Sequence, residues 1–377
     1  MVMMDSPITM SITSGAAFLL GFLLLSHLRK VNVAANSYLG LFIITLGLAM
    51  VEIPLFYKNF HLEHPNWFEM IGLSRFLTAP LLYISILYFT SINKKFNKKM
   101  LWHFLPFAIF SLFRFPFFIT GKNIEFNYET GTIVFFVLRI ALPLQALIYW
   151  ILSFIKLQKH LKKLHQISSS TEKNDLIWLK YFLLILVLIM LVWFNLIFFN
   201  LESLIQFTPF TYLLSVFFLA YFSLLQKEIF DFSKSELNEL SSIEICKKDS
   251  PKRVSGNRLN ELDEKLRRII ESEKVYLEND LSLPKLAKRL EASSNETSFV
   301  INELYQDNFY NFINRYRIEE AKRLLLSDKY NQLNVLGIAY ESGFNSKTTF
   351  NTTFKKYTGM SPTEFVKTNA ILVKKEA

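Results

Sequence analysis

The run Gly-Ile-Ala-Tyr-Glu-Ser-Gly-Phe-Asn-Ser at residues 337–346 decides how the C-terminal part of the chain folds. It reads as a short helix that ends in a tight turn before a second helix. Gly343 can supply the positive φ that such a turn needs, and Ala339 is small enough for the second helix to cross closely. Phe350 and Phe354 then give the second helix a buried face. The spacing predicts two short helices joined by a turn.

The same pattern occurs once more, upstream of this run. Ser282 is a favourable N-cap, Pro284 fits a first helical turn, and Ala287 takes the small-residue position. A break at residues 291–293 precedes the second short helix. Two longer helices complete the pattern, with the apolar sets Leu259, Leu262, Leu266, Ile269 and Ile270, and Phe309, Phe312, Ile313, Tyr316, Ile318, Ala321, Leu324 and Leu325. Residues 257–377 are therefore predicted to form a helical domain with a duplicated helix-turn-helix.

This domain resembles the DNA-binding domain of the AraC family of transcription regulators. The matching segments, in order, are Leu281–Leu283, Leu286–Ala287, Val300–Glu303, Asn308–Asn314, Arg317–Leu325, Ile338–Ser346, Phe350–Asn351, Phe354–Lys356 and Thr358–Pro362. The resemblance implies a regulator that binds double-stranded DNA through two helix-turn-helix units. Glu291 departs from the family pattern because a small turn residue is usual there, and Thr297 departs because a buried leucine is usual. We therefore expect the first unit to pack less well than the second.

The second helix of each unit is expected to enter the major groove of DNA and to present outward side chains at helical spacing. In the second unit the face opposite the phenylalanines carries Lys347, Thr348, Asn351 and Thr352. Lysine can donate to guanine, asparagine can bond adenine, and the threonine methyl can meet thymine. The corresponding residues of the first unit are Ser294, Asn295, Ser298, Phe299 and Asn302.

Other polar residues of this domain are expected to have different roles. Arg315, Arg317, Lys355 and Lys356 should face phosphate or solvent instead of bases. Ser293, Ser294 and Ser346 suit the capping of a helix at least as well as a base contact.

Up to Gln226 the chain is a series of apolar segments. Seven of them reach the length of about 20 residues that a bilayer core of about 30 Å requires. They are Ile8–Leu28, Tyr38–Tyr57, Ile71–Phe89, Leu101–Ile119, Thr132–Ile155, Leu179–Phe199 and Phe207–Leu225. The fold class is therefore predicted as all-α, with a seven-transmembrane helical bundle over residues 1–226, a cytoplasmic linker over 227–256 and the helix-turn-helix domain over 257–377.

Loop charge predicts the orientation of this bundle. The loops after the first, third and fifth spans hold twelve basic residues, which are Arg29, Lys30, Lys94, Lys95, Lys98, Lys99, Lys156, Lys159, Lys162, Lys163, Lys173 and Lys180. The alternate loops hold only Lys58 and Lys122. Because basic loops stay in the cytoplasm, the N-terminus is expected outside and the C-terminal domain inside.

Glu52, Arg75, Arg114 and Arg139 lie within the predicted spans, in the outer half of the bilayer. Charges there are costly and by default indicate function. Three arginines would suit a carboxylate or another anionic small molecule. The alternative is structural, with Glu52 neutralising one arginine and the others reaching the interface. Gln145 and Asn195 are expected to form hydrogen bonds between helices.

No catalytic or metal-binding pattern is present in the sequence. The six histidines lack metal spacing, no glycine-rich phosphate loop occurs, and Cys246 is the single cysteine. The net charge of +10 lies mainly in the loops between spans. We therefore expect no enzymatic activity, cofactor or metal. The expected partners are double-stranded DNA, the lipid bilayer, a small-molecule ligand and a second copy of the chain.

Three functions fit this architecture. The preferred one is a bacterial one-component transcription regulator in the inner (cytoplasmic) membrane, whose bundle senses a signal and acts on the DNA-binding domain through the seventh span and the linker. The second is a transporter-like bundle whose tail regulates its own operon. The third is an inert membrane anchor that carries a constitutive DNA-binding domain.

Overall fold

The computed structural model describes residues 6–28, 30–91, 97–169, 176–199, 201, 207–226, 256–327 and 333–376. The chain separates into two compact units, Met1–Lys159 with Leu176–Ile229, and His160–Asp175 with Phe230–Ala377. In the described residues every regular element is a helix, and an isolated antiparallel bridge joins Ser168 to Ser282. The predicted all-α class is confirmed. Residues 227–255, which make up nearly all of the predicted linker, lie outside the described residues.

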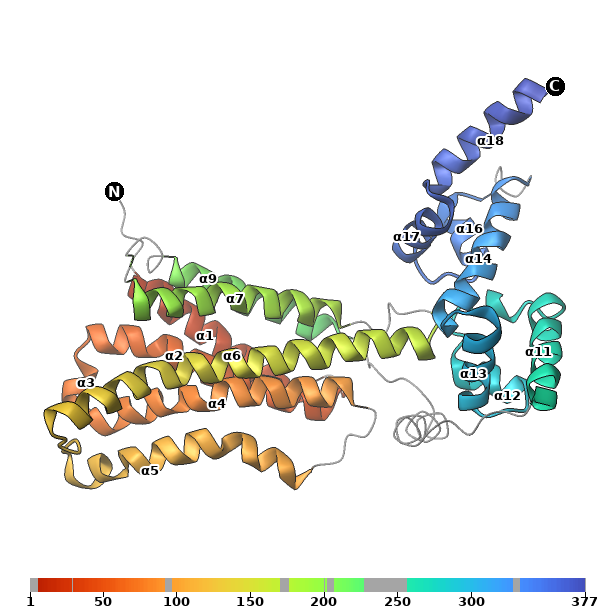
Figure 1. The fold of residues 1–377 in the computed structure, drawn as a ribbon. Coiled ribbons are helices and arrows are strands. Elements are labelled where there is room, and N and C mark those ends of the chain that lie inside the picture. The colour runs from red at the N-terminus through yellow and green to blue at the C-terminus, as the bar shows by residue number, and fades with distance from the viewer. Residues whose placement is uncertain are drawn as a thin grey trace. The chain divides into compact units, whose positions relative to one another are not determined.

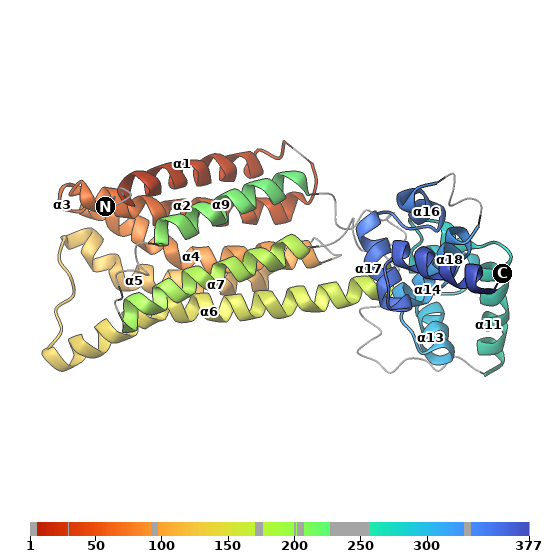
Figure 2. The same ribbon diagram turned by 90° about the horizontal axis from the view of Figure 1, so that it is seen from above.

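Seven helices in the described part of the first unit are long and apolar enough to cross a membrane (Figures 1 and 2). They are α1 (Ser6–Leu25), α2 (Val33–Tyr57), α4 (Pro65–Thr90), α5 (Leu105–Thr120) with the preceding 3-10 helix η1 (Lys98–Phe104), α6 (Tyr128–Ile167), α7 (Ile177–Phe198) and α9 (Thr208–Leu225). The single turn α3 (Phe60–Glu63) lies between α2 and α4. Each of the seven predicted spans overlaps one of these helices. Helix α6 continues well beyond the predicted end at Ile155, and its last turns belong to the second unit.

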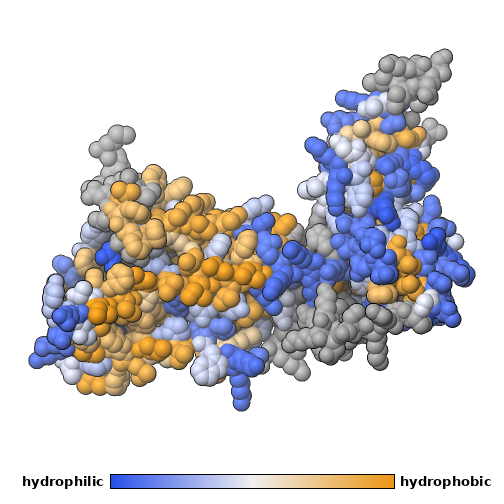
Figure 3. Space-filling model, viewed as in Figure 1, coloured by the Kyte–Doolittle hydropathy of each residue, from blue (hydrophilic) through white to orange (hydrophobic). Residues whose placement is uncertain are grey.

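The helices of the first unit pack mainly through α2, which lies between α1 and α4, while α9 contacts both α1 and α7. Helices α1 and α2 approach closely at two glycines, because a Cβ added to Gly21 of α1 would lie 3.0 Å from the carbonyl oxygen of Gly40 on α2. Small residues at helix interfaces are typical of membrane bundles, where backbone proximity replaces hydrophobic exclusion. The visible outer surface of this unit is largely apolar (Figure 3).

Prolines are accommodated in two ways. Pro54, Pro80, Pro116 and Pro143 lie inside helices, as expected for packed membrane spans. Pro106 and Pro209 instead occupy the first turns of α5 and α9, where the missing N–H has no helical partner to lose.

The second unit contains the predicted pair of helix-turn-helix units. Its helices are α11 (Gly256–Glu271), the 3-10 turn η2 (Val275–Leu277), α12 (Leu283–Arg289), α13 (Ser294–Tyr305), α14 (Phe309–Leu325), α16 (Val335–Glu341), α17 (Lys347–Thr358) and α18 (Pro362–Glu376). One apolar core includes residues of α11 to α13 and the start of α14. A second core includes the end of α14 with α16 and α17. The long helix α14 therefore serves both units.

The helix ends follow local chemistry. Ser282, Ser293 and Ser346 each accept a hydrogen bond from a backbone N–H of the helix that they precede, so their capping role is confirmed. Asn308 and Asn334 cap α14 and α16 in the same way, although they were not among the predicted caps.

The two turns close identically although their sequences differ. The N–H of Phe344 donates to the carbonyl of Ala339 at 2.9 Å, and that of Ala292 donates to Ala287 at 3.0 Å. Gly343 has φ +84° and Glu291 has φ +54°. Glutamate is uncommon at positive φ, which explains why a small residue is usual at this position. Thr297 is fully buried and its hydroxyl donates to the carbonyl of Ser293, so it occupies the expected core position with its polar group satisfied.

Gly343→Ala should destabilise the second unit, because the new Cβ would lie 2.6 Å from the carbonyl oxygen of Tyr276 on a backbone at positive φ. We expect a loss of about 2–4 kcal/mol in the free energy of unfolding. Gly359→Ala is the matched control, since Gly359 also has positive φ but nothing lies within 4 Å of an added Cβ. The control should cost about 1–2 kcal/mol. Pulse proteolysis of the full chain in detergent would measure both, and equal losses would contradict the proposed clash.

Candidate DNA interface and ligand cavity

Helix α17 presents one polar and one buried face, as predicted. Phe350 and Phe354 are fully buried, whereas Lys347, Thr348 and Thr352 are exposed. Asn351 is half-buried, and its Oδ1 atom has no hydrogen-bond partner among the described residues. Asn351 lies four residues after Lys347 and therefore on the same side of α17. The second unit thus holds the four predicted base-facing residues on one helix with their backbone fixed by the apolar core.

In helix α13 only some of the predicted base-facing residues are accessible. Asn302 is exposed and its Nδ2 donates to Ser298 Oγ at 3.3 Å, while Asn295, Ser298 and Phe299 are half-buried. Ser294 is fully buried, so its side chain cannot reach a base in this conformation. The expectation that Ser294 faces DNA is corrected, because the capping geometry of Ser293 turns the next side chain into the core.

The basic residues near these helices divide into two groups. Lys355 and Lys356 are exposed, and Lys356 Nζ donates to Asn311 Oδ1 at 3.1 Å. The Arg315 guanidinium lies 5.7 Å from the ring centre of Tyr316. These three side chains are placed where phosphate contact is feasible. Arg317 is not, because only 1% of it is exposed, so the expectation that it faces phosphate or solvent is wrong.

Arg317 lies on α14 at the junction of several segments of the second unit. Its Nε donates to the Tyr276 carbonyl at 2.7 Å and its Nη2 to the Glu278 carbonyl at 2.7 Å, which joins α14 to η2 and the turn after it. Further bonds go to Asn314 Oδ1 and to both oxygens of Ser169. Burial lowers the pKa of Arg317 to about 10, which still leaves it charged at neutral pH. Arg317 is a structural centre of the domain.

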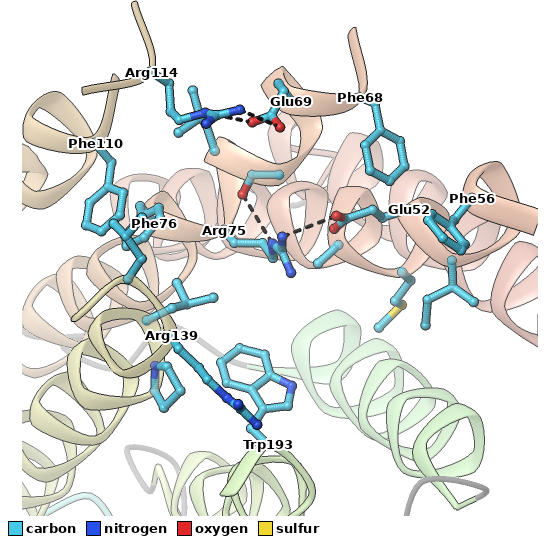
Figure 4. A pocket seen from close by; sticks show the side chains of 18 of the residues that line it. Glu52, Phe56, Phe68, Glu69, Arg75, Phe76, Phe110, Arg114, Arg139 and Trp193 are labelled. Atoms are coloured by element: carbon cyan, nitrogen blue, oxygen red, sulfur yellow. Dashed lines mark hydrogen bonds and ion pairs between the residues drawn. The ribbon is translucent and has the colours of Figure 1, made fainter. Parts of the chain in front are cut away.

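All four charged residues predicted within the spans line one cavity of about 840 Å³ in the first unit (Figure 4). Each of the seven long helices contributes to its wall, from Met10 on α1 to Tyr212 on α9. Much of the lining is aromatic, including Phe56, Phe68 and Phe110. The cavity therefore combines a large apolar volume with a few charges.

Two ion pairs join helices across this cavity. Arg75 Nη2 lies 3.2 Å from Glu52 Oε1, linking α4 to α2. Arg114 Nη2 lies 2.8 Å from Glu69 Oε1, linking α5 to α4. Glu69 lies outside the predicted span Ile71–Phe89, because α4 begins at Pro65, earlier than the hydropathy pattern predicts. The Glu52–Arg75 pair is one that the structural alternative expects, and the three arginines share the cavity with two carboxylates.

Arg139 comes from α6 and extends towards Trp193 of α7 (Figure 4). Trp193 Nε1 in turn donates to the Tyr212 hydroxyl at 3.2 Å, which ties α7 to α9 at the cavity wall. With three arginines and two glutamates among the lining residues, the charge of the cavity is net positive when all five are ionised.

The two polar residues expected to join helices behave differently. Gln145 Nε2 donates to the Phe76 carbonyl at 2.9 Å, so the predicted bond between α6 and α4 is confirmed. Asn195 instead exchanges two hydrogen bonds with the backbone of Leu201, six residues later, so its predicted interhelical role is wrong. It fixes the end of α7. Among the described residues, no group of three or more His, Cys, Asp or Glu side chains could hold a metal ion.

Residues 286–368 match a family model described as a helix-turn-helix domain. Three uncharacterised HTH-type transcriptional regulators of Staphylococcus aureus, from strains COL, MSSA476 and N315, are each 30% identical to this chain over 103 residues. The matched region is 27% of this chain and 13% of each relative. No solved structure matches significantly. The C-terminal part of the chain is therefore similar to AraC-type helix-turn-helix domains, and in this chain the matched region follows seven helices that fit a membrane domain.

Proposed function

We propose that the protein is a bacterial one-component regulator of the inner membrane, in which the helical bundle binds a signal and the C-terminal domain binds specific DNA. The observation that supports it most is the convergence of the four charged span residues on one cavity, in a chain that also carries a helix-turn-helix domain. A signal can act only if it binds two conformations of the bundle unequally. No enzymatic step is part of this proposal.

The orientation follows from charge and from the length of α6. Lys156, Lys159 and Lys162 lie on the C-terminal part of α6, beyond the Arg139 turn that lines the cavity. We infer that this basic end of the helix is cytoplasmic and that the cavity belongs to the outer half of the bilayer. The DNA-binding domain then shares the compartment of the chromosome.

The cavity favours an anionic ligand with an apolar body. Aromatic walls offer contact area to a hydrocarbon or aromatic group. Arg139 can offer a planar donor pair to a carboxylate. Arg139 is our first choice for the residue that meets the anion, because it lines the cavity from α6 and extends towards the Trp193 ring (Figure 4).

The two rival functions make different demands on the bundle. A transporter needs broken spans and polar sites near the middle of the membrane. The structure instead shows α6 and α7 as unbroken helices. An inert anchor needs no cavity of this volume, so the lining charges favour a receptor.

The orientation can be tested with single cysteines in a Cys246→Ser background. A cysteine in place of Lys122 should react with a membrane-impermeant maleimide in intact spheroplasts. A cysteine in place of Lys99 should react only after permeabilisation, because it lies on the opposite side. Labelling at position 99 but not at 122 in intact spheroplasts would place the DNA-binding domain outside the cell and contradict the proposal.

Lys347→Ala and Asn351→Ala should each weaken binding to the preferred DNA site by about 1–3 kcal/mol and leave non-specific binding nearly unchanged. The site would first be identified by sequencing DNA cross-linked to the protein in cells, and affinities would be measured by fluorescence anisotropy. Lys355→Ala is the control and should weaken all sequences alike, with a salt slope reduced by about 1. Equal losses on all sequences for Lys347→Ala would reassign that residue to phosphate.

The ligand class can be tested with pairs of phenylalkanoates and their primary amides, titrated into the full chain in nanodiscs. The acid should bind at least about tenfold more tightly than the amide, because only the acid can form a charge-assisted hydrogen bond. Arg139→Gln should remove this preference, whereas Lys122→Gln, outside the cavity, should not. Equal affinities for acid and amide in the unmodified chain would exclude an anion site.

A further inference from the structure

The end of α6 is part of the DNA-binding unit. The last turns of this helix, from His160 to Ile167, belong to the second unit, although the helix begins in the first. Leu164, Ile167, Ser168 and Ser169 are all buried, the last with 1% of its surface exposed. We call residues 160–169 the docking segment. Its burial is unlike that of a solvated loop between two spans.

The docking segment meets the first helix-turn-helix unit at the start of α12. The N–H of Ser169 donates to the Leu281 carbonyl at 3.3 Å, and its hydroxyl donates to the same carbonyl at 2.6 Å. Ser168 forms the antiparallel bridge with Ser282, which is the N-cap of α12. The contact therefore fixes the residues from which α12 begins.

Ser169 also accepts hydrogen bonds from the buried guanidinium of Arg317 on α14. Its carbonyl accepts from Arg317 Nη1 at 3.1 Å and from Asn314 Nδ2 at 3.3 Å. Its hydroxyl accepts from Arg317 Nη2 at 3.0 Å. A buried guanidinium that loses acceptors is strongly disfavoured, so Arg317 and Asn314 hold the docking segment in place.

We propose that Ser169 is a positioning residue for DNA binding, through which the extension of α6 holds α12 against α14 and so sets the orientation of α13. The docking segment supplies two acceptors of the Arg317 guanidinium, the carbonyl and the hydroxyl of Ser169, and the others come from Tyr276, Glu278 and Asn314. This inference concerns the second unit alone and does not depend on the ligand proposed for the cavity.

The contact is tested first by cross-linking in the full chain with Cys246→Ser. Ser168→Cys combined with Ser282→Cys should form a disulfide readily, because bridged strand residues have Cα separations of about 4.5–5.5 Å. Lys162→Cys combined with Ser282→Cys is the control and should not form a disulfide, since Lys162 is exposed and lies six residues, or about 9 Å of helix, before Ser168. Absence of the disulfide in the first pair, read by maleimide mass tagging, would overturn the proposal.

The role of the contact is tested with Ser169→Ala in the full chain in nanodiscs, with Ser272→Ala at an exposed position as the control. Amide hydrogen exchange should accelerate about tenfold at residues 281–286 of the first unit and stay unchanged at 347–358 of the second. Affinity for the preferred DNA site should fall about fivefold with an unchanged salt slope, because no phosphate contact is lost. Unchanged exchange and affinity would overturn the proposal, and so would equal acceleration in both units, which would indicate a general loss of stability.

Discussion

The DNA-binding domain is organised around one buried charge. Arg317 cannot lie in an apolar interior unless each N–H of its guanidinium finds an acceptor. Those acceptors come from η2, from α14 itself and from the segment after α6, while the Phe344 ring lies 5.8 Å from the guanidinium carbon. Both helix-turn-helix units and the end of α6 therefore meet at one side chain. A shift of any one of them changes the hydrogen bonding that the others share.

Charged side chains are also paired in the membrane bundle, but there the pairs border a cavity. Glu52 and Glu69 pair with arginines on neighbouring helices and thereby tie α2, α4 and α5 together. This matters most for α5, which buries none of its own residues and so has few packing contacts to hold it. The pairs stand at the edge of a cavity instead of filling it, so the charges that hold the helices also set the polarity of the space between them.

The extent of helix α6 depends partly on its local sequence and partly on tertiary contacts. Its apolar part was predicted from hydropathy, but its polar continuation to Ile167 was not. The lysines of this continuation predict a cytoplasmic loop, because a charged segment has no apolar stripe that would indicate a helix. Its buried positions, Leu164 and Ile167, are covered only in the folded unit. Hydropathy identifies where a helix can enter lipid, not where it ends.

The sequence by itself determined the all-helical class, the seven spans, the duplicated helix-turn-helix and its serine caps, because apolar periodicity and capping act within a few residues. It also singled out Glu52, Arg75, Arg114 and Arg139, since charge is rare within apolar runs. Only the tertiary structure decided that Ser294 and Arg317 are buried, that Glu69 pairs with Arg114 and that Ser169 meets α14. These facts depend on contacts between residues far apart in the chain, and no local pattern encodes which distant acceptor a buried donor will meet.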